Sequence, residues 1–124
     1  MTEQTGKVLV VDDNESVRTL LDSGLKALGY AVEAVPSAVG IDARLAAAPP
    51  AAVLLDIVME EQEGIETLMQ LKRDHPTVPV IMISSYPEYL DMASTLGADA
   101  ALEKPIDLGE LTAALERLGV VKSA

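Results

Sequence analysis

Short, continuous hydrophobic runs recur along the chain and are separated by longer stretches of mixed character. The first run, residues 8–11, reads Val-Leu-Val-Val and contains no polar position. Such runs are typical of strands in a parallel sheet, because both faces of the sheet are buried and neither needs polar side chains. The runs that predict strands occupy residues 8–11, 31–35, 52–55, 78–83 and 98–102.

The stretches between these runs have the spacing of amphipathic helices. In the first stretch, Leu21, Leu25 and Leu28 recur three or four residues apart, and Gly29 follows them. Side chains at this spacing share one helical face, and glycine is common just after a helix ends. Asp107 precedes the last stretch, where it suits an N-cap. The predicted helices occupy residues 17–28, 37–48, 64–73, 87–96 and 108–118.

The alternation of five strands with five helices predicts an α/β fold. Because strand–helix–strand connections are right-handed, the strands should form one five-stranded parallel sheet with helices on both faces. The length of 124 residues matches one ordinary domain. We therefore expect a single domain over residues 1–124, with an ordered core at about 6–119.

Polar residues follow four of the predicted strands. Asp12 and Asp13 come after the first strand, Asp56 after the third, Ser84 after the fourth and Lys104 shortly after the fifth. Ligands of open parallel sheets bind at the carboxyl ends of the strands. We therefore expect these five side chains to meet at one edge of the sheet.

Three carboxylates at one edge favour a bound cation. Two carboxylates about 5 Å apart repel each other by about 3 kcal/mol at an effective dielectric constant of about 20, and Lys104 alone cannot neutralise three charges. Mg²⁺ suits a site of a few carboxylates, waters and phosphate oxygens. A phosphoryl group bridging the metal and the ammonium would have its charge neutralised, as phosphoryl transfer requires. An ionised carboxylate needs no general base, so Asp56 and Asp12 are both candidate nucleophiles.

The charge balance disfavours several classes of partner. Nine basic and twenty acidic residues give a net charge of −11, whereas nucleic acids and anionic membranes are bound through Lys and Arg. The apolar stretch 46–55 is interrupted by Pro49 and Pro50 and is too short to span a bilayer. Residues 1–7 lack the apolar segment of a signal peptide. We expect a cytoplasmic protein with no nucleic-acid or membrane partner.

Four segments together resemble the receiver domain of two-component response regulators, in particular the single-domain, chemotaxis-regulator-like members. They read VLVVDDN at 8–14, PPAAVLLDIVMEEQEG at 49–64, VIMISS at 80–85 and GADAALEKP at 97–105. The likeness extends over about residues 7–118. It implies the flavodoxin-like, doubly wound receiver fold.

The resemblance implies a metal site and a phosphoacceptor at the acidic edge. Asp56 is then the phosphoacceptor, and Asp13, Asp56 and the backbone carbonyl of Val58 are direct Mg²⁺ ligands. Asp12 acts through a metal-bound water.

The resemblance also implies how such a domain signals. Lys104 pairs with a phosphoryl oxygen, its peptide bond to Pro105 is cis, and Ser84 is the switch hydroxyl that moves toward the phosphoryl group. The donor is a histidine kinase or a histidine phosphotransfer protein. A downstream protein partner is bound through the fourth helix, fifth strand and fifth helix. Such a domain is no enzyme beyond self-catalysed phosphotransfer and slow autodephosphorylation. Homodimer formation, and whether the chain is complete or excised from a longer protein, stay open.

The sequence departs from the receiver pattern in the acceptor loop, in the fifth strand and around the fourth helix. Glu60 stands where the family has proline, and Ala101 stands where the family has an aromatic residue that reports phosphorylation. The stretch 84–97 is shorter than is common, so we expect a short or displaced fourth helix. Tyr86 and Tyr89 lie in this stretch and are candidates for the reporting role.

Two other functions stay open on the sequence alone. A phosphorylation-independent pseudo-receiver would bind its partner through the same fold. A haloacid-dehalogenase-like phosphatase would use Asp12 as its nucleophile, but Asn14 stands where that family has a second aspartate. A P-loop nucleotide-binding protein is disfavoured, because no GxxxxGKS/T motif follows any predicted strand.

Overall fold

The computed structural model describes residues 6–57 and 63–122. Within these residues, five strands alternate with five helices, as the hydrophobic pattern predicts. The strands are β1 (Lys7–Val11), β2 (Ala31–Val35), β3 (Ala52–Asp56), β4 (Val80–Ser84) and β5 (Ala100–Glu103). The helices are α1 (Glu15–Ala27), α2 (Ile41–Ala47), α3 (Glu63–Asp74), α4 (Pro87–Thr95) and α5 (Leu108–Arg117). None of these helices has the length and apolar character needed to cross a membrane.

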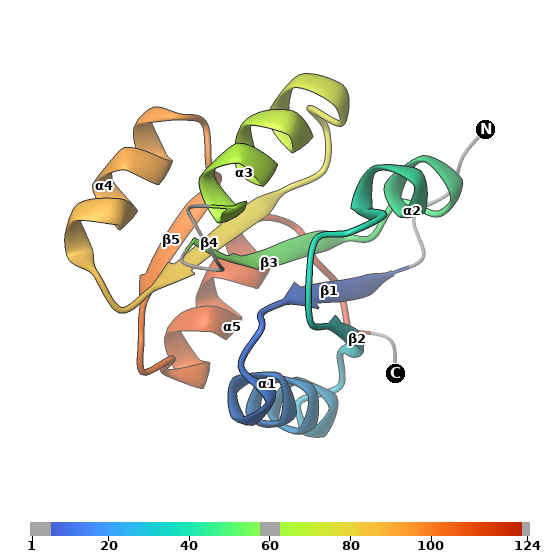
Figure 1. Ribbon diagram of the computed structural model, residues 1–124. Helices are drawn as coiled ribbons and strands as arrows, with labels where there is room; N and C mark the ends of the chain where they lie inside the picture. The colour runs from blue at the N-terminus through green and yellow to red at the C-terminus, as the bar shows by residue number, and fades with distance from the viewer. Residues whose placement is uncertain (1–5, 58–62, 123–124) are drawn as a thin grey trace.

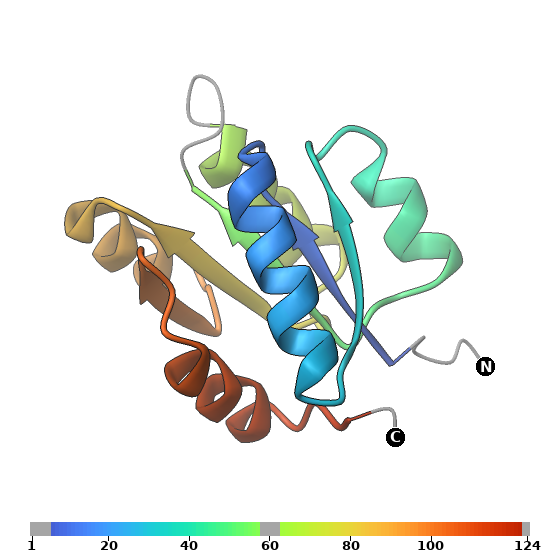
Figure 2. The ribbon, with the colours of Figure 1, turned by 90° about the horizontal axis from the view of Figure 1, so that it is seen from below.

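All five strands lie in one parallel sheet, in the order β2-β1-β3-β4-β5. Helices α2, α3 and α4 cover one face of this sheet, and α1 and α5 cover the other (Figure 1). The view from below shows α1 and α5 in front of the strands (Figure 2). The predicted doubly wound α/β fold is confirmed, and the carboxyl ends of all the strands lie at the same edge.

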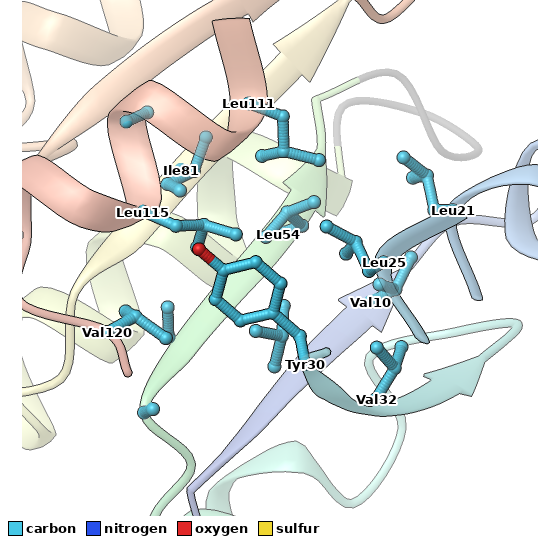
Figure 3. Close-up of a cluster of buried hydrophobic side chains, with 14 of the residues drawn as sticks. Val10, Leu21, Leu25, Tyr30, Val32, Leu54, Ile81, Leu111, Leu115 and Val120 are labelled. Atoms are coloured by element: carbon cyan, nitrogen blue, oxygen red, sulfur yellow. The ribbon is translucent and has the colours of Figure 1, made fainter. Parts of the chain in front are cut away.

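Alternate residues of the central strands belong to two separate cores. Every residue of β3 and β4 is buried, which explains why their sequences have no polar position before the last residue. Leu54 and Ile81 belong to the core under α1 and α5, whereas Leu55 and Met82 belong to the core under α2, α3 and α4. Figure 3 shows the first of these cores, with side chains from α1, α5 and the strands, among them Leu21, Leu25, Leu54, Ile81, Leu111 and Leu115.

Helix α2 begins at Ile41 and not at residue 37, where the hydrophobic spacing predicts it. Gly40 has a φ of 77°, and a left-handed residue cannot continue a right-handed helix. Before it, Ala38 is buried and its carbonyl accepts the N–H of Ile41 at 3.0 Å. The chain therefore turns into the core before the helix starts.

Strands β4 and β5 both begin two residues later than the hydrophobic runs predict, at Val80 and Ala100. Asp99 accounts for this difference, because its carboxylate accepts the N–H of Val80 at 2.8 Å and its own N–H donates to the Val80 carbonyl at 2.8 Å. Helix α4 has nine residues, in agreement with the short fourth helix expected.

Candidate functional site

The carboxyl ends of the adjacent strands β1 and β3 bring three carboxylates together. Asp12 and Asp13 follow β1, and Asp56 is the last residue of β3. One carboxylate oxygen from each of the three lies within 4.8 Å of the others. Asp12 and Asp56 are only 0% and 3% exposed, whereas Asp13 is exposed. The cluster therefore has two buried carboxylates and one that faces solvent.

Lys104 reaches this cluster from the end of β5. Its Nζ lies 3.0 Å from Oδ2 of Asp12 and 3.3 Å from Oδ2 of Asp56. Its backbone N–H donates to the Ser84 carbonyl at 2.8 Å, which connects the residue after β5 to the end of β4. The peptide bond between Lys104 and Pro105 is cis, as expected.

The carboxylates keep Lys104 protonated. Burial lowers the pKa of Lys104, but its interactions with Asp12 and Asp56 outweigh this effect and raise the pKa above its ordinary value. The ammonium is therefore charged at neutral pH. It is one cation against three carboxylates, so the edge keeps an excess of negative charge.

The two carboxylate oxygens of Asp12 have different partners. Its Oδ1 accepts the backbone N–H of Asn14 at 2.8 Å. Its Oδ2 is buried, and the cation it meets is the Lys104 ammonium at 3.0 Å. Three clustered carboxylates beside a single ammonium are a donor set that fits a hard divalent cation with oxygen ligands.

Residues 8–116 match the family model of the response regulator receiver domain. The chain belongs to this family. The receiver is 36% identical over 117 residues to the DNA-binding transcriptional regulator NtrC of Salmonella typhimurium, which covers 92% of the chain and 25% of that protein. It is 32% identical over 114 residues to the transcriptional regulatory protein QseB of Haemophilus influenzae, which covers 90% of the chain and 52% of that protein. The chain thus spans about a quarter to a half of these relatives.

Solved structures of receivers share the fold. The receiver domain of NtrX from Brucella abortus superposes with a TM-score of 0.82 at 31% identity, covering 90% of this chain and 96% of that one. The chemotaxis protein CheY4 of Vibrio cholerae superposes with a TM-score of 0.78 at 27% identity, covering 90% and 97%. Receiver domains belong to signalling proteins, and they do not form a family of catalytic enzymes. Membership of this family therefore favours a receiver function over that of a haloacid-dehalogenase-like phosphatase.

Ser84 of this receiver is fully buried at the end of β4. Its Oγ accepts the backbone N–H of Tyr86 at 3.0 Å. Tyr86 is the N-cap residue of α4, and its ring packs edge-to-face on Tyr89, with centroids 5.9 Å apart. The hydroxyl of Ser84 is therefore bonded to the residue at which α4 begins.

The structure brings most of the predicted receiver residues to one edge. β3 lies between β1 and β4, so Asp56 stands between the carboxylates after β1 and Ser84 at the end of β4. Val58, predicted to supply a backbone ligand, lies outside the described residues, and so does Glu60.

Two residues that contact the site backbone are absent from the sequence-based prediction. Arg18 on α1 donates from Nη1 to the backbone carbonyl of Asp12 at 2.8 Å. Gly64, the second residue of α3, lies so close to β3 that a Cβ there would meet the carbonyl oxygens of Asp56 and Ile57. Two features of the sequence could have indicated these residues. Arg18 lies one turn into the helix that follows the acidic pair, and Gly64 lies at the start of a predicted helix.

Proposed function

We propose that the protein is a phosphoacceptor receiver that takes a phosphoryl group onto Asp56 from a histidine kinase or a histidine phosphotransfer protein. The observation that carries the proposal is the contact of Lys104 Nζ with both Asp12 and Asp56 beside a cluster of three carboxylates. Receiver domains work with histidine kinases and downstream targets. For a receiver with these partners we also propose a cytoplasmic setting.

Asp56 is the better of the two candidate nucleophiles because of its place in the sheet. The Oδ1 of Asp12 is committed to the N–H of Asn14. Asp56 ends the strand between β1 and β4. A phosphoryl group on Asp56 would therefore have the acidic pair on one side and Ser84 and Lys104 on the other.

The chemical step needs an ionised carboxylate, a well-placed phosphorus and neutralisation of the phosphoryl charge. A carboxylate oxygen of Asp56 attacks the phosphorus of the donor's phosphohistidine, the phosphorus–nitrogen bond breaks, and the histidine nitrogen keeps the electron pair. The ammonium of Lys104 pairs with a phosphoryl oxygen, which offsets the charge on the acyl phosphate.

Receiver domains normally bind Mg²⁺ at an acidic pocket, and the acidic edge of this chain suits that ion. We assign Asp13 and Asp56 as direct ligands, with the Val58 carbonyl, and Asp12 as a residue that acts through a bound water. When bound, the metal supplies positive charge that neutralises the phosphoryl oxygens. In the metal-free protein, the three carboxylates repel one another, and the ammonium of Lys104 offsets one of their three charges.

Ser84 and Lys104 connect the site to a proposed partner surface formed by α4, β5 and α5. If Ser84 changes rotamer so that Oγ moves to a phosphoryl oxygen, Oγ no longer accepts the N–H of Tyr86, and α4 loses a hydrogen bond at its start. Lys104 follows β5, and its N–H donates to the Ser84 carbonyl. Ser84 thus lies two residues before the N-cap of α4 and Lys104 lies directly after β5, so both groups that sense the phosphoryl group adjoin the proposed partner surface.

We also propose that residues 1–124 form a single receiver domain with an ordered core at about 6–119. The support is that the family model matches residues 8–116. The continuous sheet and the two cores on its faces agree with this extent.

The proposed function is tested by incubating the protein with acetyl phosphate and Mg²⁺ and measuring intact mass. The parent should gain the mass of one phosphoryl group, and it should gain none when EDTA removes the metal. Asp56→Asn should gain none, whereas Asp22→Asn, at a half-buried carboxylate on α1 that pairs with Lys26, should behave as the parent. Phosphorylation of Asp56→Asn at the parent rate would show that Asp56 is not the acceptor.

A further inference from the structure

The turn that carries the two acidic residues after β1 is held by a side chain from α1. Nη1 of Arg18, a partly buried residue, donates to the Asp12 carbonyl at 2.8 Å. The N–H of Asp12 donates to the Val35 carbonyl at 3.2 Å. The carbonyl of Asp12 lies just beyond β1, where its partner is a guanidinium and not a neighbouring strand. Arg18 therefore fixes the direction in which this carbonyl points.

The direction of the Asp12 carbonyl controls where Asp13 lies. The peptide group between the two residues is planar and trans, so its carbonyl and the N–H of Asp13 point in opposite directions. Holding the carbonyl thus fixes the plane from which the Asp13 side chain projects. Asp13 is exposed, and its carboxylate makes no hydrogen bond or ion pair with the described residues. The backbone is therefore its main constraint.

Arg18 makes this contact with a backbone carbonyl, although it carries a full charge. In the described part of the chain its guanidinium forms no ion pair, and Asp22, one turn further along α1, pairs with Lys26 at 3.1 Å. A charged donor gives a stronger hydrogen bond to a carbonyl than a neutral donor does. The arrangement suits a residue that orients the acidic turn.

We infer that Arg18 is a positioning residue for the cation site, which acts by holding the Asp12 carbonyl so that Asp13 presents its carboxylate as a ligand. The inference rests on the proposed function, because it needs the divalent cation at the acidic edge. Residues behind metal ligands orient them in this way, and their loss typically weakens metal affinity by about 10- to 100-fold.

The positive charge of Arg18 acts in the opposite direction. A cation close to the carboxylates repels Mg²⁺, so an arginine that contributed only charge would weaken metal binding, and its removal would tighten binding. An arginine that positions Asp13 strengthens metal binding, and its removal weakens it. The sign of the change in Mg²⁺ affinity therefore separates the two roles.

The test is titration of the metal-free protein with MgCl₂ by isothermal calorimetry, for the parent, Arg18→Met, Arg18→Lys and Arg44→Met. Arg18→Met should raise the Mg²⁺ Kd by about tenfold or more. Arg18→Lys, which keeps a flexible charged donor, should recover part of this loss. Arg44→Met is the matched control, because Arg44 pairs with Glu33 on β2 and its loss changes the net charge equally. It should leave the Kd nearly unchanged.

A second measurement shows whether Arg18 acts through Asp13. In the Asp13→Asn background, Arg18→Met should change the Mg²⁺ Kd far less than it does in the parent, since the ligand it positions is gone. An equal or tighter Kd for Arg18→Met than for the parent overturns the inference while leaving the proposed function in place. Failure of the parent itself to bind Mg²⁺ overturns the proposed cation site. If Arg18→Met does not fold, a parent-like Kd for Arg18→Lys together with a parent-like Kd for Arg18→Gln overturns the inference.

Discussion

Burial of the Tyr30 hydroxyl lowers the stability of the protein by a measurable amount. The Tyr30 side chain lies in the core under α1 and α5, and in the described part of the chain its hydroxyl has no hydrogen-bond partner (Figure 3). A buried hydroxyl without a partner costs about 1–3 kcal/mol. The ring also lies 5.8 Å from the Lys122 ammonium, a contact that phenylalanine would keep.

Replacing Tyr30 by phenylalanine should therefore preserve or raise stability at neutral pH, by up to about 1 kcal/mol. Burial raises the pKa of Tyr30 above the ordinary value of 10.0, and the negative charge of Glu116 raises it further. The unfolded chain then releases this proton before the folded protein does, so the free energy of unfolding of the parent falls as the pH rises above 10. Tyr30→Phe should lose less stability over this range than the parent.

Urea unfolding at pH 7 and at a pH above 10 would measure both effects. Tyr86→Phe, at a half-exposed tyrosine, is the control. A loss of stability at neutral pH of more than about 1 kcal/mol in Tyr30→Phe would mean that the hydroxyl has a partner in solution.

The start of α3 packs closely against the acceptor strand β3. Gly64 leaves no space for a Cβ, because the carbonyl oxygens of Asp56 and Ile57 occupy that volume. Gly64→Ala should push α3 away from β3, destabilise the protein by about 1–3 kcal/mol and slow phosphorylation of Asp56 by about tenfold, or about 1.4 kcal/mol of barrier.

The matched control is Gly109→Ala, because Gly109 is also the second residue of a helix. A Cβ added at Gly109 would meet only a side-chain oxygen of Asp107 and no backbone of the sheet. Stability by urea unfolding and phosphorylation by intact mass should both differ between the two variants. Equal phosphorylation rates in both would mean that the position of α3 does not influence the acceptor.

Helix α4 should respond to phosphorylation through Ser84. The Oγ of Ser84 accepts the N–H of Tyr86 at the start of this helix, and the coupling between the two states should be worth about 1–3 kcal/mol. On phosphorylation, amide NMR shifts should change in α4, β5 and α5 more than in α2. Ser84→Ala should still accept a phosphoryl group but show much smaller shifts in α4.

Ser85→Ala serves as the control for this experiment, because Ser85 is the exposed neighbour of the switch residue. Shift changes in Ser84→Ala as large as those in the parent would place the route to α4 elsewhere. Changes confined to α1 and α2 would remove the proposed partner surface.

The whole molecule carries a net charge of −11, and the acidic edge concentrates part of it at one end of the sheet. Mg²⁺ should bind there only when the chain is folded, because the three carboxylates converge only in the folded sheet. At a concentration of about 100 times Kd, this binding should add about 2.7 kcal/mol of stability. Thermal unfolding with and without millimolar MgCl₂ measures the gain.

Asp13→Asn provides the complementary test at this scale. Without metal it should unfold at a higher temperature than the parent, because one repelling carboxylate is gone. With MgCl₂ it should gain less than the parent. An Asp22→Asn variant, at a carboxylate that pairs with Lys26 on the surface of α1, should gain as much as the parent. A parent melting temperature that is indifferent to MgCl₂ would exclude the metal site.

The sequence by itself determined the elements and the chemistry available at their ends. Continuous apolar runs such as Val8–Val11 must be buried on both sides, and this fixes a parallel sheet between layers of helices. Polar residues at the ends of these runs must then share one edge. Hydrophobic pattern and burial are local properties, so a single sequence carries them directly.

Only the tertiary structure decided which groups touch. Lys104 and Asp56 are 48 residues apart, and their contact depends on strand order and on the path of the loop after β5. The bond from Arg18 to the Asp12 carbonyl and the fit of Gly64 against β3 depend on how α1 and α3 pack. The start of α2 at Ile41 depends on the backbone angle of Gly40 and the burial of Ala38. Such contacts join residues through space, where the spacing of hydrophobic positions along the chain carries no information.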